Sequence, residues 1–142
     1  MIQRIQTLWL MLATTIGIAS LKLSVFAGHR ISDVIPPIIV SEVTGSYNIM
    51  LMVATISTAT LAFLSIFLFK NRKLQIKVVI TALLISLGTL LLYYWQSKAF
   101  IASESNYTLT AILPISIPIL LILAIRGIHK DEKLIKSLDR LR

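Results

Sequence analysis

Four long apolar stretches without a single acidic residue dominate this chain. They run over residues 5–23, 47–69, 78–95 and 109–125. A helix needs roughly 20 mainly apolar residues to cross a hydrocarbon core of about 30 Å. Apolar residues fill these stretches without alternating, so continuous helices satisfy the backbone and a β-barrel does not. The sequence therefore predicts an all-α integral membrane bundle of four transmembrane helices.

The connections between the stretches are too short to hold a second domain. We therefore expect one membrane domain over residues 1–142. Its expected parts are spans over 5–25, 47–69, 77–96 and 107–127, an outer loop over 27–46 and a cytoplasmic tail over 128–142. The short link before the third span predicts an antiparallel hairpin of the second and third helices.

The net charge of +8 comes from Lys and Arg residues that cluster on one side of the predicted bundle. The clustered residues include Lys70, Arg72, Lys73, Lys77, Arg126 and Lys130. The opposite side has few basic residues, so the positive-inside rule places both termini in the cytoplasm. We expect these six side chains to contact lipid headgroups or an acidic partner surface. The distribution follows membrane topology and argues against nucleic-acid binding.

Two features near the outer end leave alternatives open. Lys22 is expected to extend its long side chain to the headgroups, although a membrane-embedded cation that pairs with a substrate or subunit is the functional alternative. The outer loop contains Pro36, Pro37 and β-branched runs over 34–40 that fit a short hairpin or an extended flap. Its apolar residues either cover the end of the bundle or form an epitope for a partner.

Small residues within the spans predict helix contacts. Thr55, Ala59 and Ala62 lie in the second span, and Gly88 lies in the third. In lipid, helix association depends on close packing, so faces of small residues usually lie at interfaces. The hydroxyl groups along the second span equally fit bonds to carbonyls of their own helix.

Pro114 and Pro118 lie four residues apart in the fourth span. Each removes a backbone donor and obstructs the carbonyl four residues earlier, so we expect a kink, either as static packing or as a hinge. Aromatic residues near the ends of the first and third spans fit interfacial anchors. These residues are Trp9, Tyr93, Tyr94 and Trp95.

The tail after residue 130 differs from the spans in its pattern. Leu134, Leu138 and Leu141 recur at helical spacing among charged residues, which predicts a short amphipathic helix on the cytoplasmic side. Such a helix either lies on the inner leaflet or docks on a partner protein.

The side chains that usually carry catalysis are missing from the spans. The chain has no cysteine, which excludes disulfides, thiolate metal sites and a cysteine nucleophile. His29 and His129 fall on opposite sides of the predicted bilayer and cannot ligate one haem or metal together. The spans contain no acidic residue, and the chain has no phosphate-binding glycine motif. We therefore expect no enzyme activity, no metal site and no cofactor.

The two ends of the chain carry a resemblance to a known family. The opening residues MIQRIQTLW, the four spans and the ending KDEKLIKSLDRLR resemble an uncharacterised family of small membrane proteins of Bacteroidota, catalogued as a domain of unknown function. The resemblance covers the whole chain and implies a bacterial inner-membrane location. It brings no catalytic residues with it.

Two functions fit these observations. The first is a non-enzymatic accessory subunit of a larger inner-membrane complex, such as a translocon, secretion machine or respiratory assembly. Its small helix faces and its tail would contact other integral membrane proteins. The second is a small homo-oligomeric transporter or lipid-binding protein for a neutral or apolar ligand, with the proline bend beside a cavity.

Overall fold

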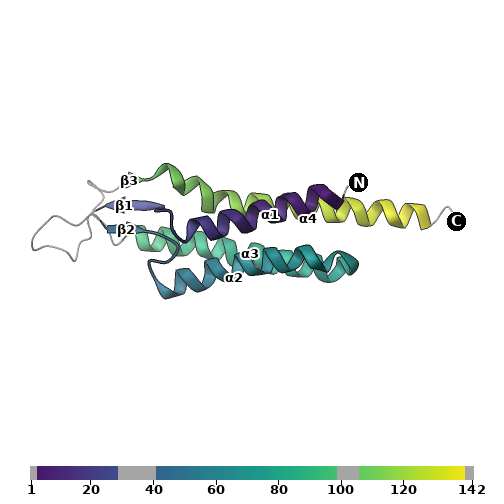
Figure 1. Ribbon diagram of the computed structural model, residues 1–142, viewed down its shortest axis with the longest axis horizontal. Helices are drawn as coiled ribbons and strands as arrows, with labels where there is room; N and C mark the ends of the chain where they lie inside the picture. The colour runs from purple at the N-terminus through teal and green to yellow at the C-terminus, as the bar shows by residue number, and fades with distance from the viewer. Residues whose placement is uncertain (1–2, 29–40, 99–105, 140–142) are drawn as a thin grey trace, which may run out of the picture.

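The computed structural model describes residues 3–28, 41–98 and 106–139. Four helices lie side by side along its long axis, and short strands gather at one end (Figure 1). The helices are α1 (Gln3–Ser20), α2 (Ile49–Phe67), α3 (Arg72–Ser97) and α4 (Ile112–Asp139), with short 3-10 turns η1 (Leu68–Lys70) and η2 (Leu109–Ala111). The strands are β1 (Phe26–Gly28), β2 (Ser41–Val43) and β3 (Asn106–Tyr107).

The helices form a closed ring of neighbours. α1 packs against α2 and α4, and α3 packs against the same two helices from the other side. The expected antiparallel hairpin of α2 and α3 is confirmed, because only η1 and Asn71 separate these helices. Three described segments are long and apolar enough to cross a membrane, namely Ile49–Phe67, Arg72–Ser97 and Leu109–Lys133. The apolar part of α1, Ile5–Ser20, is shorter.

The end of α1 corrects the expected first span, which was placed over residues 5–25. The helix stops at Ser20 because the turn after β2 caps it. The Gly45 backbone N–H donates to the Ser20 carbonyl at 2.9 Å, and the Ser46 hydroxyl donates to the Leu21 carbonyl at 2.9 Å. The chain then turns into an extended course, where the Val25 N–H donates to the Val43 carbonyl at 2.8 Å.

A small sheet corrects the all-α expectation. Its strands pair antiparallel in the order β2-β1-β3 and close one end of the bundle. The Phe26 and Tyr107 rings meet edge to face with their centroids 5.0 Å apart. Behind the strands lies a separate small core of Val25, Phe26, Val43, Leu51 and Tyr93. The apolar runs over 34–40 that suggested a hairpin or a flap lie outside the described residues.

The exterior of the bundle is apolar, unlike that of a water-soluble protein, and its core is apolar as well. Large apolar side chains face outward, as at Leu84, Leu91 and Ile119, which are 61%, 70% and 55% exposed. Buried hydroxyls bond back to their own helix, as where Thr55 donates to the Leu51 carbonyl at 2.7 Å. Apolar surface on this scale is stable in lipid and not in water, because water penalises exposed apolar area.

α4 corrects two expectations at once. Pro114 is the third residue of this helix, where the backbone N–H has no intrahelical partner in any case, so only Pro118 lies in the helix interior. The kink predicted from both prolines therefore reduces to one position.

The tail is not a separate short helix, since α4 continues unbroken from Ile112 to Asp139. The tail is therefore the end of the same helix that contains the fourth predicted span.

Candidate functional site

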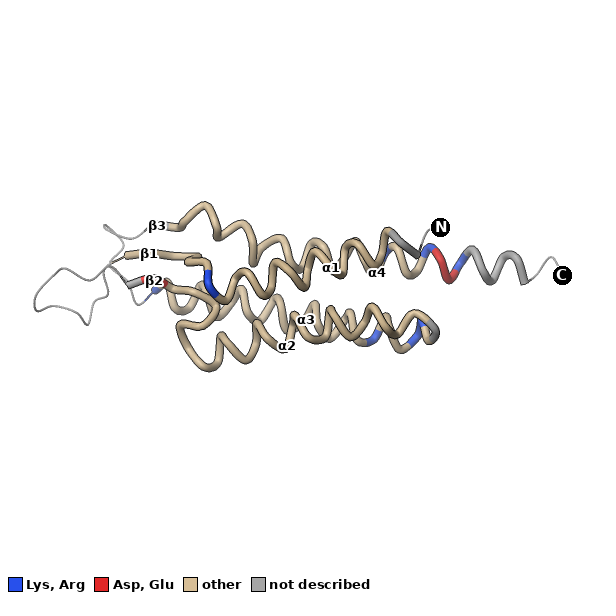
Figure 2. Tube along the Cα trace, viewed as in Figure 1, with Lys and Arg blue, Asp and Glu red and all other residues tan. Residues whose placement is uncertain are grey.

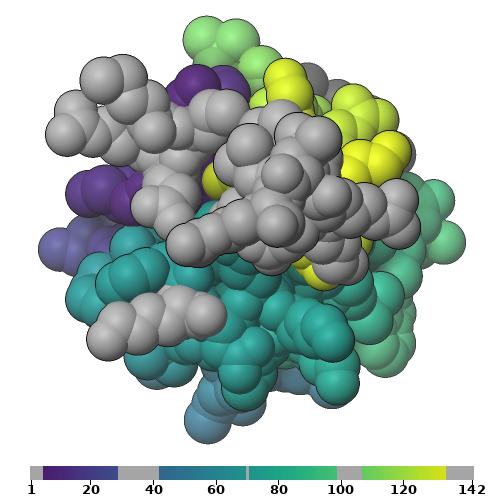
Figure 3. Space-filling model, turned by 90° about the vertical axis from the view of Figure 1, so that its right-hand side faces the viewer, coloured from purple at the N-terminus to yellow at the C-terminus, as the bar shows by residue number. Residues whose placement is uncertain are grey.

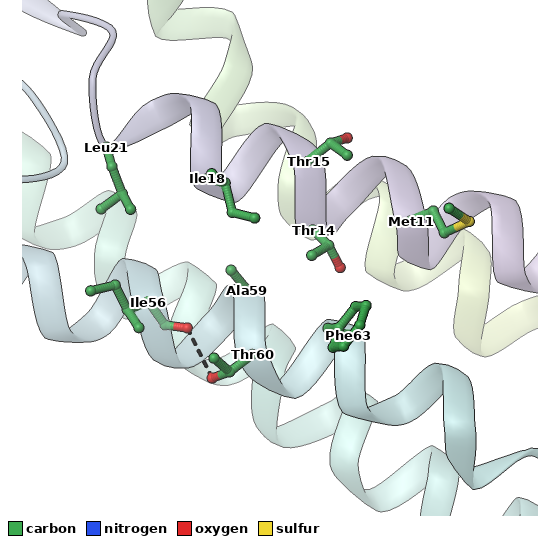
Figure 4. Close-up of a pocket in the computed structure, with 9 residues that line it drawn as sticks. All are labelled: Met11, Thr14, Thr15, Ile18, Leu21, Ile56, Ala59, Thr60 and Phe63. Carbon is green, nitrogen blue, oxygen red and sulfur yellow. Dashed lines mark hydrogen bonds between the residues drawn. The ribbon is translucent and has the colours of Figure 1, made fainter.

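An open apolar groove of about 510 Å³ runs along the outside of the bundle between α1 and α2 (Figure 4). Both helices contribute side chains along its length. The lining residues are Met11, Thr14, Thr15, Ile18, Leu21, Ile56, Ala59, Thr60 and Phe63. Because both helices belong to the apolar bundle, the groove opens toward the surroundings of the bundle and not toward its core.

The groove is apolar although three threonines line it. Thr14 donates to the Leu10 carbonyl at 2.8 Å, and Thr60 donates to the Ile56 carbonyl at 2.9 Å (Figure 4). Thr15 likewise donates to the Leu12 carbonyl at 3.0 Å. Each hydroxyl proton is therefore used by a carbonyl of its own helix, and helix contacts here depend on packing rather than on new hydrogen bonds.

Small residues allow the two helices to approach beneath the groove. A Cβ added at Gly17 would lie 3.1 Å from the Cβ of Ala59, so α1 and α2 approach closely here and a larger residue would fit only if Ala59 moved by a few tenths of an ångström. At the other end of the groove, the Phe63 ring packs edge to face against Phe67 with centroids 5.2 Å apart. The groove thus follows from short side chains on α1 and α2, with an aromatic ring fixed at one end.

The predicted helix-packing residues divide between the interior and the groove. Thr55 and Ala62 are 3% and 0% exposed inside this chain and are not free to contact a partner helix. Ala59, at 6% exposed, borders the groove. Gly88 is not the close contact expected of it, because a Cβ at that position would meet nothing within 4 Å. Gly17, which sequence reasoning passed over, makes the close contact instead.

The end of the bundle that lies opposite the sheet is called the basic end. It comprises the starts of α1 and α3, the turn η1, and α4 from Arg126 onward. Described Lys and Arg residues lie at the two ends of the bundle, and its middle has none (Figure 2). Four of the predicted basic side chains are exposed at the basic end, namely Lys73, Lys77, Arg126 and Lys130. Arg72 is half-buried, and the side chain of Lys70 is not described. Lys22, at the sheet end, is exposed as expected.

A buried polar contact at the basic end was missed from the sequence. The Gln6 side-chain amide on α1 donates to Asp131 Oδ2 on α4, and both residues are 6% exposed. The second oxygen, Oδ1, is buried without a hydrogen-bond partner among the described residues. A Cβ at Gly127 would lie only 2.8 Å from Gln6 Cγ, so glycine makes room for the amide.

The spacing of buried residues along α4 is the signal that could have revealed this contact. Every third or fourth residue is buried in turn: Ile117, Leu121, Ala124, Ile128 and Asp131. An acidic residue that continues such a register faces the neighbouring helix and not the solvent. Asp131 stands at the start of the predicted charged tail, where an acidic residue is expected to be exposed to solvent.

The basic end carries the helix that continues beyond the bundle. Figure 3 looks at this end, with α1 and α4 in its upper half and the α2–α3 hairpin below. Asp139 is eight residues beyond Asp131, so at 1.5 Å per residue α4 continues about 12 Å past the Gln6 contact. Described α1 extends only from Gln6 to Gln3 in the same direction. The side chains of Leu134 and Leu138 and the whole of Leu141 lie outside the described residues.

The predicted aromatic anchors fall into different environments. Tyr94 and Trp95 are 58% and 71% exposed at the sheet end of α3, as interfacial residues would be. Trp9 is half-buried and packs on the main core. Tyr93 is 8% exposed, which corrects its assignment as an anchor, and its buried hydroxyl has no hydrogen-bond partner in the described segments. It borders an interior cavity of about 10 Å³ together with Pro114 and hydroxyl side chains of α1, α2 and α3.

The described residues hold no group of three His, Cys, Asp or Glu side chains that could ligate a metal ion. His129 is exposed, and His29 lies outside the described residues.

These features define a small helical membrane protein whose recognisable surfaces are an apolar groove and a charged end. The sequence model of one family, described as a domain of unknown function (DUF4293), matches residues 2–141. The chain belongs to this family, which confirms the resemblance to an uncharacterised domain family. No curated protein and no solved structure matches the chain.

Proposed function

We propose that this protein is a non-enzymatic accessory subunit of a larger bacterial inner-membrane complex, such as a translocon, secretion machine or respiratory assembly. In this proposal all four helices cross the membrane, α1 included, and the basic end lies in the cytoplasm. The concentration of basic residues at that end supports this orientation through the positive-inside rule.

The α1/α2 groove is the observation that carries the proposal. Lipid tails are as apolar as leucine, so helices associate in a membrane where small residues permit close packing. Gly17 and Ala59 provide that closeness, and the groove beside them has room for ridges of a partner helix. A transmembrane helix of another integral membrane protein is therefore the occupant that we propose.

The extension of α4 supports a second contact with the same complex. The buried positions of α4 recur every three or four residues, and the last of them that the structure describes is Asp131. The next positions with the same spacing, four and then three residues further on, are Ile135 and Leu138. Within the bundle this register packs on α1, but described α1 ends near the level of Asp131. We propose that a cytoplasmic part of the partner continues the packing there, and that Arg126 and Lys130 face acidic groups beside it.

A homo-oligomeric transporter or lipid-binding protein is the alternative. That function needs a chamber for a neutral or apolar ligand beside the Pro114 end of α4. Pro114 also lines a pocket of about 220 Å³ that is open at the surface beside Tyr94 and Tyr107, but the interior cavity that it borders holds only about 10 Å³, the space of one water molecule. This size favours the accessory role over a ligand-carrying one.

Blocking the groove tests the proposal. Thr60 lies exposed on the groove, so Thr60→Trp fills it with little effect on the interior. Thr81→Trp is the matched control, because Thr81 is also exposed and also donates to its own helix, at 2.7 Å to Val78. Tagged full-length protein would be purified from its native membrane in mild detergent, and its companions identified and weighed by native mass spectrometry.

The expected result is one reproducible integral membrane companion that is lost in Thr60→Trp, by tenfold or more, and kept in Thr81→Trp. A lone monodisperse wild-type protein would contradict the proposal. A homodimer that Thr60→Trp dissociates would replace it with the homo-oligomeric alternative. Equal retention in both variants would show that the groove is not the docking site.

A further inference from the structure

A second pocket, of about 400 Å³, lies at the basic end and is distinct from the α1/α2 groove. Its lining is mixed and more apolar than polar, with residues from α1, α2, η1 and α3. The lining residues are Gln6, Thr7, Ile66, Phe67, Phe69, Arg72 and Gln75. The pocket therefore lies where the apolar α2 ends and the basic link to α3 begins.

Arg72 is the side chain in this pocket whose hydrogen bonding is incomplete. Its guanidinium nitrogen Nη1 is buried and finds no hydrogen-bond partner among the residues that the structure describes. Burying a charged donor without an acceptor is unfavourable, because the group loses its water and gains nothing in return. An acceptor from outside the described chain would remove this cost.

The neighbouring polar groups do not supply that acceptor. The Gln75 side-chain amide donates to the Ser65 carbonyl at 3.0 Å, and the Gln6 amide donates to Asp131. Asp131 binds Gln6 from the α4 side and does not line the pocket. Lys73 and Lys77, one and five residues further along α3, are exposed and add positive charge to this region.

We propose that this pocket binds the phosphate group of a membrane phospholipid, with Arg72 as the donor. The planar guanidinium group matches phosphate oxygens in geometry and charge. The apolar part of the pocket suits the rest of a lipid, since Phe67 and Phe69 are 61% and 53% exposed beside Arg72. A free phosphate would leave the exposed parts of both rings uncovered, because within the chain Phe67 packs only edge to face against Phe63 among the described rings. The proposal does not depend on any partner protein.

Native mass spectrometry of the full-length protein in mild detergent, with added phosphatidylglycerol, measures the binding. Wild type is expected to retain one phosphatidylglycerol molecule. Arg72→Gln is expected to lower the retained fraction about fivefold, which corresponds to about 1 kcal/mol per basic residue at a membrane surface. Arg72→Lys is expected to restore part of it, because Lys keeps the charge without the planar fork.

Lys73→Gln is the matched control, since it removes the same charge from the adjacent exposed position. An equal loss in Lys73→Gln and Arg72→Gln would overturn the pocket in favour of general electrostatic attraction. Inorganic phosphate serves as the second probe. If it displaces phosphatidylglycerol at comparable concentration, the site is one for free phosphate and the lipid assignment is wrong.

Phe69→Ser keeps the proposal testable if Arg72→Gln fails to fold. Phe69 is more than half exposed, so its replacement leaves the packed interior intact. It is expected to lower phosphatidylglycerol retention while helix content by circular dichroism is unchanged. Full retention in Phe69→Ser would contradict the apolar part of the site.

Discussion

The two ends of the bundle differ in how completely this chain closes them. At the sheet end, three paired strands, the capped terminus of α1 and a small core around Phe26 and Val43 use the backbone groups and apolar side chains locally. At the basic end, the buried Gln6 side chain donates to Asp131 between α1 and α4, and α4 continues beyond this contact. The comparison teaches that, among the described residues, backbone pairing joins the segments of the sheet end, whereas side-chain packing and polar side-chain contacts join the helices at the basic end.

Removing the contact at the basic end is expected to have the largest effect on stability. Gln6→Leu leaves both buried oxygens of Asp131 without a partner, so the free energy of unfolding should fall by about 2 to 3 kcal/mol. Circular dichroism during thermal unfolding in mild detergent measures it. In the double variant Gln6→Leu/Asp131→Leu most of the loss should return, since no polar group is then left buried. A double variant as unstable as the single one would show that packing, and not the hydrogen bond, joins these helices.

A substitution at the sheet end tests how rigid the closed end is. A Cβ at Gly45 would lie 2.7 Å from the Ser20 carbonyl oxygen, and backbone atoms cannot rotate aside. Gly45→Ala should therefore lower the free energy of unfolding by about 1 to 2 kcal/mol in the same assay. Gly88→Ala is the control, because the space around Gly88 is open and alanine favours a helix by about 0.5 to 1 kcal/mol. If both variants lose stability equally, the cap on α1 does not restrain the sheet end.

The smallest effect is expected where the sheet end meets the bundle interior. The Tyr93 hydroxyl is buried near Thr55 and Ser20, but within the described part of the chain no group lies at hydrogen-bond distance from it, so Tyr93→Phe should change the free energy of unfolding by less than about 0.5 kcal/mol. Exposed Tyr94→Phe provides the reference. A loss above about 1 kcal/mol in Tyr93→Phe alone would instead indicate a bound water in the cavity of about 10 Å³ beside it.

The sequence predicted secondary structure where lipid dictates it and failed where distant segments meet. Uninterrupted apolar residues require helices in a membrane, which is why α2, α3 and α4 lie close to the predicted spans. The strands β1 and β3 are separated by more than 70 residues, and neither two- nor three-residue segment carries a strand pattern of its own. Their pairing depends on the helices that bring them together.

The candidate sites show the same division. The clustered Lys and Arg residues marked the basic end, because charge along the chain reports which segments leave the bilayer. The orphaned nitrogen of Arg72 could not be inferred, because it results from the packing of α1, α2 and α3 around one side chain. Tyr93 and Tyr94 are adjacent and chemically identical, yet in α3 the Tyr93 ring is buried in the core and the Tyr94 ring is exposed. Composition alone does not distinguish the two.

By itself, the sequence determined that this chain consists of apolar helices with charge at their ends. In hydrocarbon every backbone N–H and C=O group must be hydrogen-bonded within the protein, and for continuous apolar segments a helix achieves this. The tertiary structure alone decided which apolar face has a groove, where α1 stops, and that Gln6 and Asp131 meet across 125 positions of sequence. The physical reason is that the free energy of transferring a segment into lipid is close to a sum of contributions from its individual residues, which the sequence lists. Grooves, caps and buried polar contacts depend instead on the distances between helices.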